Sequence, residues 1–128
     1  MKIRLQDGLP YVSASLTYRG QQLTFDDVML DTGSVGTIFS IDKVLAIGVQ
    51  YEAGDTIHRI RGVGGAEFVV LKRIDLVSVG ELQVRDFDVE LGALAYGFEI
   101  DGIIGVDLLT QTGAIIDLAQ LEVYPVTR

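Results

Sequence analysis

The sequence predicts an all-β fold built from short strands, and three observations support this prediction. Segments that alternate apolar and polar residues, rich in β-branched side chains, recur along most of the 128 residues. Glycine is abundant, at 15 residues, whereas proline occurs only twice, which suits a fold with many tight turns. Turn-forming residues separate the segments at regular spacing, as is typical of a β-barrel or a β-sandwich. The length fits a single domain over residues 1–128.

The first half of the chain is expected to form one β-hairpin and one short helix. The strands are predicted over Tyr11–Tyr18 and Leu23–Leu30, with the turn at Arg19–Gln22. A short helix is expected over Ile41–Ile47, with a glycine just after its end. Ser40 is placed to cap this helix, because its hydroxyl can accept a hydrogen bond from an N–H of the first turn.

The second half is expected to contain three hairpins and a second helix. Two strands are predicted to join at Gly62–Gly65, and a second hairpin turns around Gly80–Glu81. Phe87–Leu91 continues as strand. A short helix follows over Val106–Thr112, and a closing hairpin turns at Ala119–Gln120.

Composition and charge exclude several classes of function. The chain has no cysteine and one histidine, His58, so disulfides, thiolate nucleophiles and His-rich zinc centres are ruled out. Its formal net charge is −8, whereas nucleic-acid binding depends on Lys and Arg that neutralise phosphates. No apolar run is long enough to cross a bilayer, and the N-terminal residues lack a signal-peptide core. We therefore expect no metal or other cofactor, no nucleic-acid or membrane partner, and by default a cytoplasmic protein.

Three short motifs in a fixed order suggest a functional site. The first is D-T-G-S at residues 31–34, after an apolar strand. The second is the hairpin tip R-G-V-G-G at residues 61–65, and the third is I-I-G at residues 103–105, before the second helix. Each alone has an ordinary structural explanation: a turn, a flexible hairpin tip, or a buried strand ending at a glycine. Their combination is what points to function.

In this order the motifs resemble those of the retroviral-type aspartic proteases, the retropepsin-like family, over roughly residues 11–124. The resemblance implies a closed acid-protease-type β-barrel with one or two short helices and a glycine-rich flap hairpin. It implies a catalytic carboxylate from Asp31, a hydrogen bond from Thr32 to a partner's loop, and room for substrate at Gly33. Ser34 is expected beside the substrate, where it can donate to the outer carboxylate oxygen. The other substrate contacts are expected from the flap and the I-I-G motif: Gly62, Val63, Gly64, Gly65 and Ile104.

Catalysis of this type needs two neighbouring carboxylates, but the sequence carries D-T-G only once. The other acids next to apolar runs, Asp101 and Asp117, lack the Thr-Gly that would hold them in a similar loop. The second carboxylate is therefore expected from Asp31 of another copy, which a symmetric homodimer brings to the same axis. The implied activity is that of an aspartic endopeptidase that hydrolyses a peptide or protein substrate.

Two positions depart from the retroviral pattern, in which an acidic residue follows the first motif and an arginine follows I-I-G. Here these positions hold Val35 and Val106, which we expect to touch as an apolar pair.

The terminal segments Met1–Leu5 and Leu121–Tyr124 are candidates for the dimer interface or, equally, for outer strands of the barrel. The alternative to a protease is a non-catalytic β-barrel that binds peptides or partners or supports dimerisation, because a fold does not fix a function.

Overall fold

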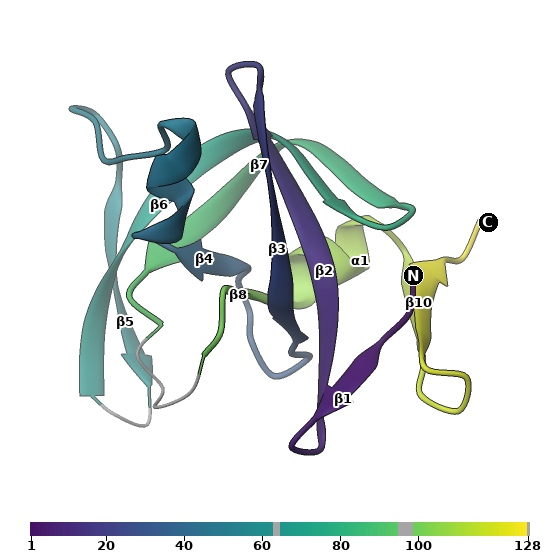
Figure 1. Ribbon diagram of the computed structural model, residues 1–128. Helices are drawn as coiled ribbons and strands as arrows, with labels where there is room; N and C mark the ends of the chain where they lie inside the picture. The colour runs from purple at the N-terminus through teal and green to yellow at the C-terminus, as the bar shows by residue number, and fades with distance from the viewer. Residues whose placement is uncertain (63–64, 95–98, 128) are drawn as a thin grey trace.

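The computed structural model of the chain describes residues 1–62, 65–94 and 99–127, with only the backbone described for residues 60–62 and 65–67. Within these ranges the chain is mainly strand, with a 3₁₀-helix and a short α-helix (Figure 1). The elements are β1 (Arg4–Gln6), β2 (Leu9–Tyr18), β3 (Gln21–Leu30), β4 (Ile38–Ser40), η1 (Lys43–Ile47), β5 (Ile57–Gly62), β6 (Gly65–Val79), β7 (Leu82–Gly92), β8 (Gly102–Ile104), α1 (Val106–Gln111), β9 (Ala114–Asp117) and β10 (Glu122–Pro125).

The main sheet closes on itself. Of the described strands, eight follow the order β1-β2-β3-β8-β4-β7-β6-β5, and β2 also pairs with β6. This extra pairing sets Ser15 opposite Ser78 and Thr17 opposite Leu76, so the strands from β2 round to β6 form a ring. The predicted all-β fold of the acid-protease type is confirmed, and the predicted closure takes the form of this ring-like sheet.

The predicted hairpins are present, and the first is tighter than expected. Its strands extend to Tyr18 and from Gln21, so that only Arg19 and Gly20 form the turn. Both turn residues have positive φ, at 48° and 82°. Two residues of this kind give a turn whose twist matches that of the flanking strands, which explains why the strands pair to their ends.

The two helices lie where the sequence places them, but the first differs in its start and its capping. The short helix expected over Ile41–Ile47 is the 3₁₀-helix η1, which begins at Lys43, and its N-cap is Asp42, not Ser40. The Ser40 hydroxyl accepts only a long hydrogen bond, 3.4 Å, from the backbone N–H of Lys43. Gly48 ends the helix at a φ of 77°. No helix in the described part of the chain is both long and apolar enough to span a membrane.

The position of β8 determines the architecture of the site. The strands β3 and β4 follow each other in the chain but do not pair; β8 lies between them, parallel to β3 and antiparallel to β4. The loop of residues 31–37, which joins β3 to β4, must therefore pass over the end of β8. This crossing brings the D-T-G-S and I-I-G motifs into contact.

Buried apolar side chains form two clusters. The larger is the main core, in which Phe25 and Phe39 stack with ring centroids 5.6 Å apart. The smaller is made by Tyr11, Ile38, Leu94, Ile100 and Ile103, with the partly buried Met29 packed against it. Because Met29 and Ile38 lie on either side of the loop of residues 31–37, the smaller cluster supports both ends of that loop.

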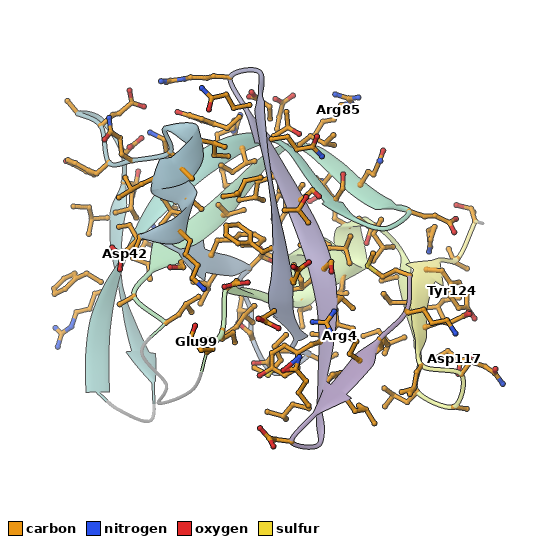
Figure 2. The ribbon with its side chains drawn as sticks, in the orientation of Figure 1. Arg4, Asp42, Arg85, Glu99, Asp117 and Tyr124 are labelled. Atoms are coloured by element: carbon orange, nitrogen blue, oxygen red, sulfur yellow. The ribbon has the colours of Figure 1, made fainter. Side chains whose placement is uncertain are left out.

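The two ends of the chain lie side by side (Figure 1). The N-terminal amine of Met1 donates to the carbonyl of Val123 at 3.1 Å, and Val123 N–H donates back to the Met1 carbonyl at 2.9 Å. On its other side β10 pairs with β9, to form the hairpin on which Figure 2 labels Asp117 and Tyr124. Residues 121–123 are thus joined to residues 1–3 of the same chain, as expected of outer strands, and a dimer interface at Leu121–Tyr124 stays a prediction. Within the described residues, β9 is the strand of this hairpin with an unpaired edge.

Candidate active site

Asp31 follows β3 and is held by the backbone around it. Its N–H donates to the carbonyl of Ile104 at 3.0 Å, which anchors the loop to the end of β8. Its carboxylate Oδ1 accepts a hydrogen bond of 2.9 Å from the N–H of Gly33. A β-carbon at position 33 would lie 3.2 Å from the same oxygen, tighter than most real contacts, so glycine suits this turn. The turn leaves the carboxylate partly exposed and fixed in direction.

The role expected of Ser34 is different in the structure. Its hydroxyl donates to the carbonyl of Gly36 at 2.8 Å and not to the Asp31 carboxylate. The hydrogen bond closes the far side of the loop, because Ser34 and Gly36 are two residues apart on the same turn. In the single chain Ser34 therefore stabilises the loop and makes no hydrogen bond to the carboxylate of Asp31.

Gly105 allows the loop to pass directly over the end of β8. A β-carbon at this position would lie 2.3 Å from the carbonyl oxygen of Gly36 and 2.8 Å from that of Ser34, so no larger residue fits. The next two N–H groups of the chain donate to the same loop, from Val106 to the Ser34 carbonyl at 2.8 Å and from Asp107 to the Val35 carbonyl at 3.2 Å. The glycine of the I-I-G motif thus serves the contact between the two motifs.

A second layer of support, which the sequence did not reveal, joins Thr37 to Asp107. The hydroxyl of Thr37 donates to Asp107 Oδ1 at 2.7 Å, and its N–H donates to Oδ2 at 3.2 Å. The same hydroxyl accepts a hydrogen bond of 3.0 Å from the N–H of Gly105. Thr37 is 0% exposed, so its polar groups need these partners. The sequence did contain a signal for this contact: Asp107 is an acid in the first turn of the predicted helix. The first N–H groups of a helix have no partner within it, so an acid there can accept hydrogen bonds.

Glu90 lies on the other side of the loop. It stands on β7 opposite Ile38 of β4, and its N–H donates to the Thr37 carbonyl at 2.8 Å. A β-carbon at Gly36 would lie 2.5 Å from Glu90 Oε1, so the carboxylate occupies the space that a side chain at position 36 would fill. Burial, and next the negative charge of Asp107, raise the pKa of Glu90, while His58 opposes this shift. The sequence analysis predicted a strand here and assigned no role to Glu90, because it belongs to none of the three motifs.

The predicted flap hairpin is formed by β5 and β6, which pair up to Gly62 and Gly65. Val63 and Gly64 lie outside the described residues, so their predicted contacts with substrate remain predictions. The lower ends of β5 and β3 lie at the same end of the molecule (Figure 1), so the hairpin and the Asp31 loop share that end.

Ile104, which was expected to contact substrate, is 0% exposed and belongs to the main core, which gives its side chain no surface for a substrate. Its contribution to the site is the carbonyl that holds Asp31.

The expected apolar pair of Val35 and Val106 is not formed as a packed contact. Val35 is 87% exposed and Val106 is 37% exposed. Their backbones are close, because the hydrogen bonds from residues 106 and 107 end on residues 34 and 35. The two positions are neighbours, as expected, but the Val35 side chain projects into solvent.

No second carboxylate hydrogen-bonds to Asp31 among the described residues. Asp101 is 8% exposed, pairs with Lys43 and accepts the N–H of Asp27 at 3.1 Å. Asp117 accepts the N–H of Gln120 at 2.9 Å and so closes the last hairpin turn. The structure thus agrees with the expectation that neither acid completes the site within one chain.

An apolar hollow opens beside Asp31. Thr32, the exposed residue after it, lines this hollow, together with residues of α1 and of β9. The lining residues are Thr32, Val106, Leu109, Thr110, Gly113, Ala114 and Ile116. The hollow and the unpaired edge of β9 therefore form one continuous surface next to the carboxylate.

Comparison with known proteins agrees with these features. Residues 14–108 match a protein-family model described as aspartyl protease, and the matched range contains all three motifs. No curated protein matches the chain.

Proposed function

The chain belongs to the retropepsin-like aspartyl protease family, and from this premise we propose that it is an aspartic endopeptidase active as a homodimer. One observation carries the proposal. Hydrogen bonds from the backbone and from Ser34 hold the loop around Asp31 in place, yet the described residues place only one carboxylate, that of Asp31, at this site. A two-fold axis beside Thr32 would bring two copies of Asp31 together without any further element.

The two carboxylates would divide the chemistry between them. Two such groups about 3 Å apart do not both ionise readily, so the pair holds one proton, as is established for aspartic proteases. The charged carboxylate takes a proton from a water molecule, whose oxygen attacks the carbonyl carbon of the scissile bond. The neutral carboxylate gives its proton to the carbonyl oxygen. Collapse of the tetrahedral intermediate, with a proton passed to the leaving nitrogen, regenerates the pair.

We place the dimer interface on the hollow beside Thr32 and the free edge of β9. This surface is apolar, adjoins the carboxylate that needs a partner, and ends in backbone N–H and C=O groups able to pair with a second strand. Two copies of β9 related by a two-fold axis can pair as antiparallel strands. The arrangement replaces the interface expected from the chain ends, which are already paired with each other.

The catalytic proposal is tested with Asp31→Asn, which keeps the shape of the side chain and removes its acid. Peptide-library cleavage between pH 4 and 8, read by mass spectrometry, should fall by at least about 10²-fold, the lower scale of general acid–base catalysis. Asp42→Asn is the matched control, since Asp42 is exposed and makes no side-chain capping hydrogen bond (Figure 2). Equal cleavage by wild type and Asp31→Asn would refute the assignment. Cleavage by neither would favour the non-catalytic binding module.

The interface is tested with Ile116→Glu, which places a charge in the apolar hollow. Sedimentation should show a monomer, and the specific activity of the wild type should rise with protein concentration as dimers form. Leu45→Glu is the control, because Leu45 is 53% exposed on η1, away from the hollow. An Ile116→Glu protein that remains dimeric and active would exclude this surface.

A further inference from the structure

We propose that Glu90 determines substrate specificity by binding a basic side chain, Lys or Arg, of the peptide. The inference rests on the proposed function, because it concerns the peptide that the proposed site would hold. It adds the substrate class, and it assigns a role to an acid that lies outside the three motifs.

The first step of the argument is the place of the carboxylate. Glu90 Oε1 and Cδ would lie 2.5 and 2.9 Å from a β-carbon at Gly36, and Gly36 is part of the loop that carries Asp31. The carboxylate of β7 therefore stands where a side chain of the catalytic loop itself would be. Position 36 is glycine in this chain, and so the space is free for Glu90.

The second step is what surrounds this carboxylate. The charges of Asp107 on α1 and of His58 on β5, the first strand of the proposed flap, both act on the pKa of this carboxylate. From β6, the residue paired with Glu90 is Leu71, which is not titratable. Glu90 thus lies beside the Asp31 loop and within range of a charge on the flap strand, and these are the two elements that would hold a peptide between them.

The third step compares Glu90 with the acid next to it. Asp107 accepts hydrogen bonds from the N–H and hydroxyl of Thr37 and from the N–H of Leu108. Within the described residues no hydrogen bond or ion pair is found for the carboxylate of Glu90, although it is partly buried. A partly buried acid without a partner lowers stability, and an incoming donor relieves this cost. A cation relieves it best, because it also compensates the nearby charge of Asp107.

The fourth step is symmetry. In a homodimer each copy contributes one Glu90, and the two-fold axis passes through the site. The preference for a basic residue should therefore occur at two peptide positions, one on each side of the scissile bond and at equal distance from it. A binding site remote from the cleft would give no such pairing.

The experiment uses pairs of decapeptides that differ only by Lys or norleucine at one position, and scans that position along the peptide. For the wild type, kcat/KM should favour Lys about tenfold or more at two symmetric positions, the effect of one hydrogen bond between charged groups. In Glu90→Gln the ratio of kcat/KM for Lys over norleucine peptides should fall close to one, because the Lys peptides lose more than the norleucine peptides do. The wild-type ratio should also shrink as Glu90 becomes protonated in acid, whereas the ratio for the variant should not change with pH.

Asp86→Asn is the matched control, because Asp86 is an exposed acid on the same strand and its positive φ, 52°, suits asparagine. This variant should retain the wild-type ratio. If the wild type cleaves Lys and norleucine peptides equally, or Glu90→Gln keeps the preference, the inference fails and the protease assignment stands. If Glu90→Gln slows all peptides alike, Glu90 supports the loop and does not select the substrate. If the wild type cleaves no peptide, both proposals fall.

Discussion

Carboxylates hold two irregular segments of this molecule against the sheet, and they do so by different chemistry. Loop 31–37 is held by Asp107, which accepts the hydroxyl and N–H of Thr37 at 2.7 and 3.2 Å. The segment of residues 49–56, which leads into β5, is held by Lys72, whose ammonium lies 2.6 Å from Glu52 and 2.9 Å from Asp55. The first contact uses neutral donors around one acid, and the second uses ion pairs.

The two supports also differ in exposure, and this difference indicates what each can do. Thr37 is 0% exposed, whereas the side chain of Glu52 is 42% exposed. A buried network of short hydrogen bonds is directional and little affected by salt, but partly exposed ion pairs are screened by it. The loop that carries Asp31 is thus held firmly, while the base of the proposed flap has a support that solution conditions can weaken.

The largest effect is expected from Thr37→Val, which keeps the shape of the side chain and removes its hydroxyl. The N–H of Gly105 and one oxygen of Asp107 lose their partner in a buried place, at a cost of about 2–3 kcal/mol. Urea denaturation should show this loss of unfolding free energy. The kcat should fall as well, because a catalytic loop displaced by about 1 Å can lose about 10² in rate.

Two controls isolate the buried hydroxyl. Thr37→Ser keeps it and should recover most of the stability. Thr24→Val removes an exposed hydroxyl that is hydrogen-bonded to the hydroxyl of Ser15 on the sheet surface, at 2.9 Å. This change should have little effect on the free energy of unfolding. A Thr37→Val protein as stable as the Thr24→Val protein would show that the network contributes nothing.

A smaller effect is expected from Lys72→Met, which removes both ion pairs and keeps an apolar side chain of similar length in a site that is 5% exposed. Unfolding free energy should fall by less than in Thr37→Val. Arg73→Met is the control on the same strand: Arg73 and Asp88 form a pair in which the side chains are 66% and 52% exposed, and its loss should be almost neutral.

Acid and salt should erase the effect of Lys72→Met. Hydrogen bonds from Lys72 lower the pKa of both Glu52 and Asp55. A carboxylate with a lowered pKa in the folded state contributes stability above its unfolded pKa, and this contribution is lost as pH falls through the folded pKa. Denaturation curves of wild type and variant should therefore converge at low pH, and they should also approach each other in 1 M NaCl. Curves that stay parallel would contradict an ion-pair support.

The smallest effect, of opposite sign, is expected from Glu90→Gln. The raised pKa of Glu90 means that its charge opposes folding above that pKa, and that this cost is relieved as pH falls through it. The variant should therefore melt slightly above the wild type at neutral pH, and the difference should vanish in acid. A variant less stable than the wild type at pH 7 would mean that the charge of Glu90 has a favourable partner within the fold.

The sequence predicted the local elements and the motifs but not how they meet. Alternation and turn residues located the hairpins, and the D-T-G-S motif located Asp31, but the hydrogen bond from the N–H of Gly33 to its carboxylate was found only in the structure. The start and the cap of the first helix were wrong, because the ends of a short helix depend on packing that the segment itself does not encode. Closure was expected from the resemblance, but the residues through which it occurs were not predictable, because nothing local pairs residues 15–17 with residues 76–78.

The residues that sequence reasoning missed act through contacts between distant parts of the chain. Thr37, Asp107 and Glu90 come together only because β8 lies between β3 and β4. Ser34 was expected to donate to Asp31, but the carbonyl of Gly36 is nearer in the folded loop. Gly36 itself carried a usable signal, since a glycine beside a buried strand can mark a close approach by another group.

The ring formed when β2 pairs with β6 also has a consequence for how the chain folds. The hairpins β2–β3 and β6–β7 join neighbouring segments and can form early, because their turns are short. Closure of the ring must wait until residues far apart in the chain meet, and pairings of this kind slow folding. Until that step β2 and β6 each have an unpaired edge, on which two unfinished chains could join. Dilute refolding should therefore give more native protein than concentrated refolding, although the active form that we propose is a dimer.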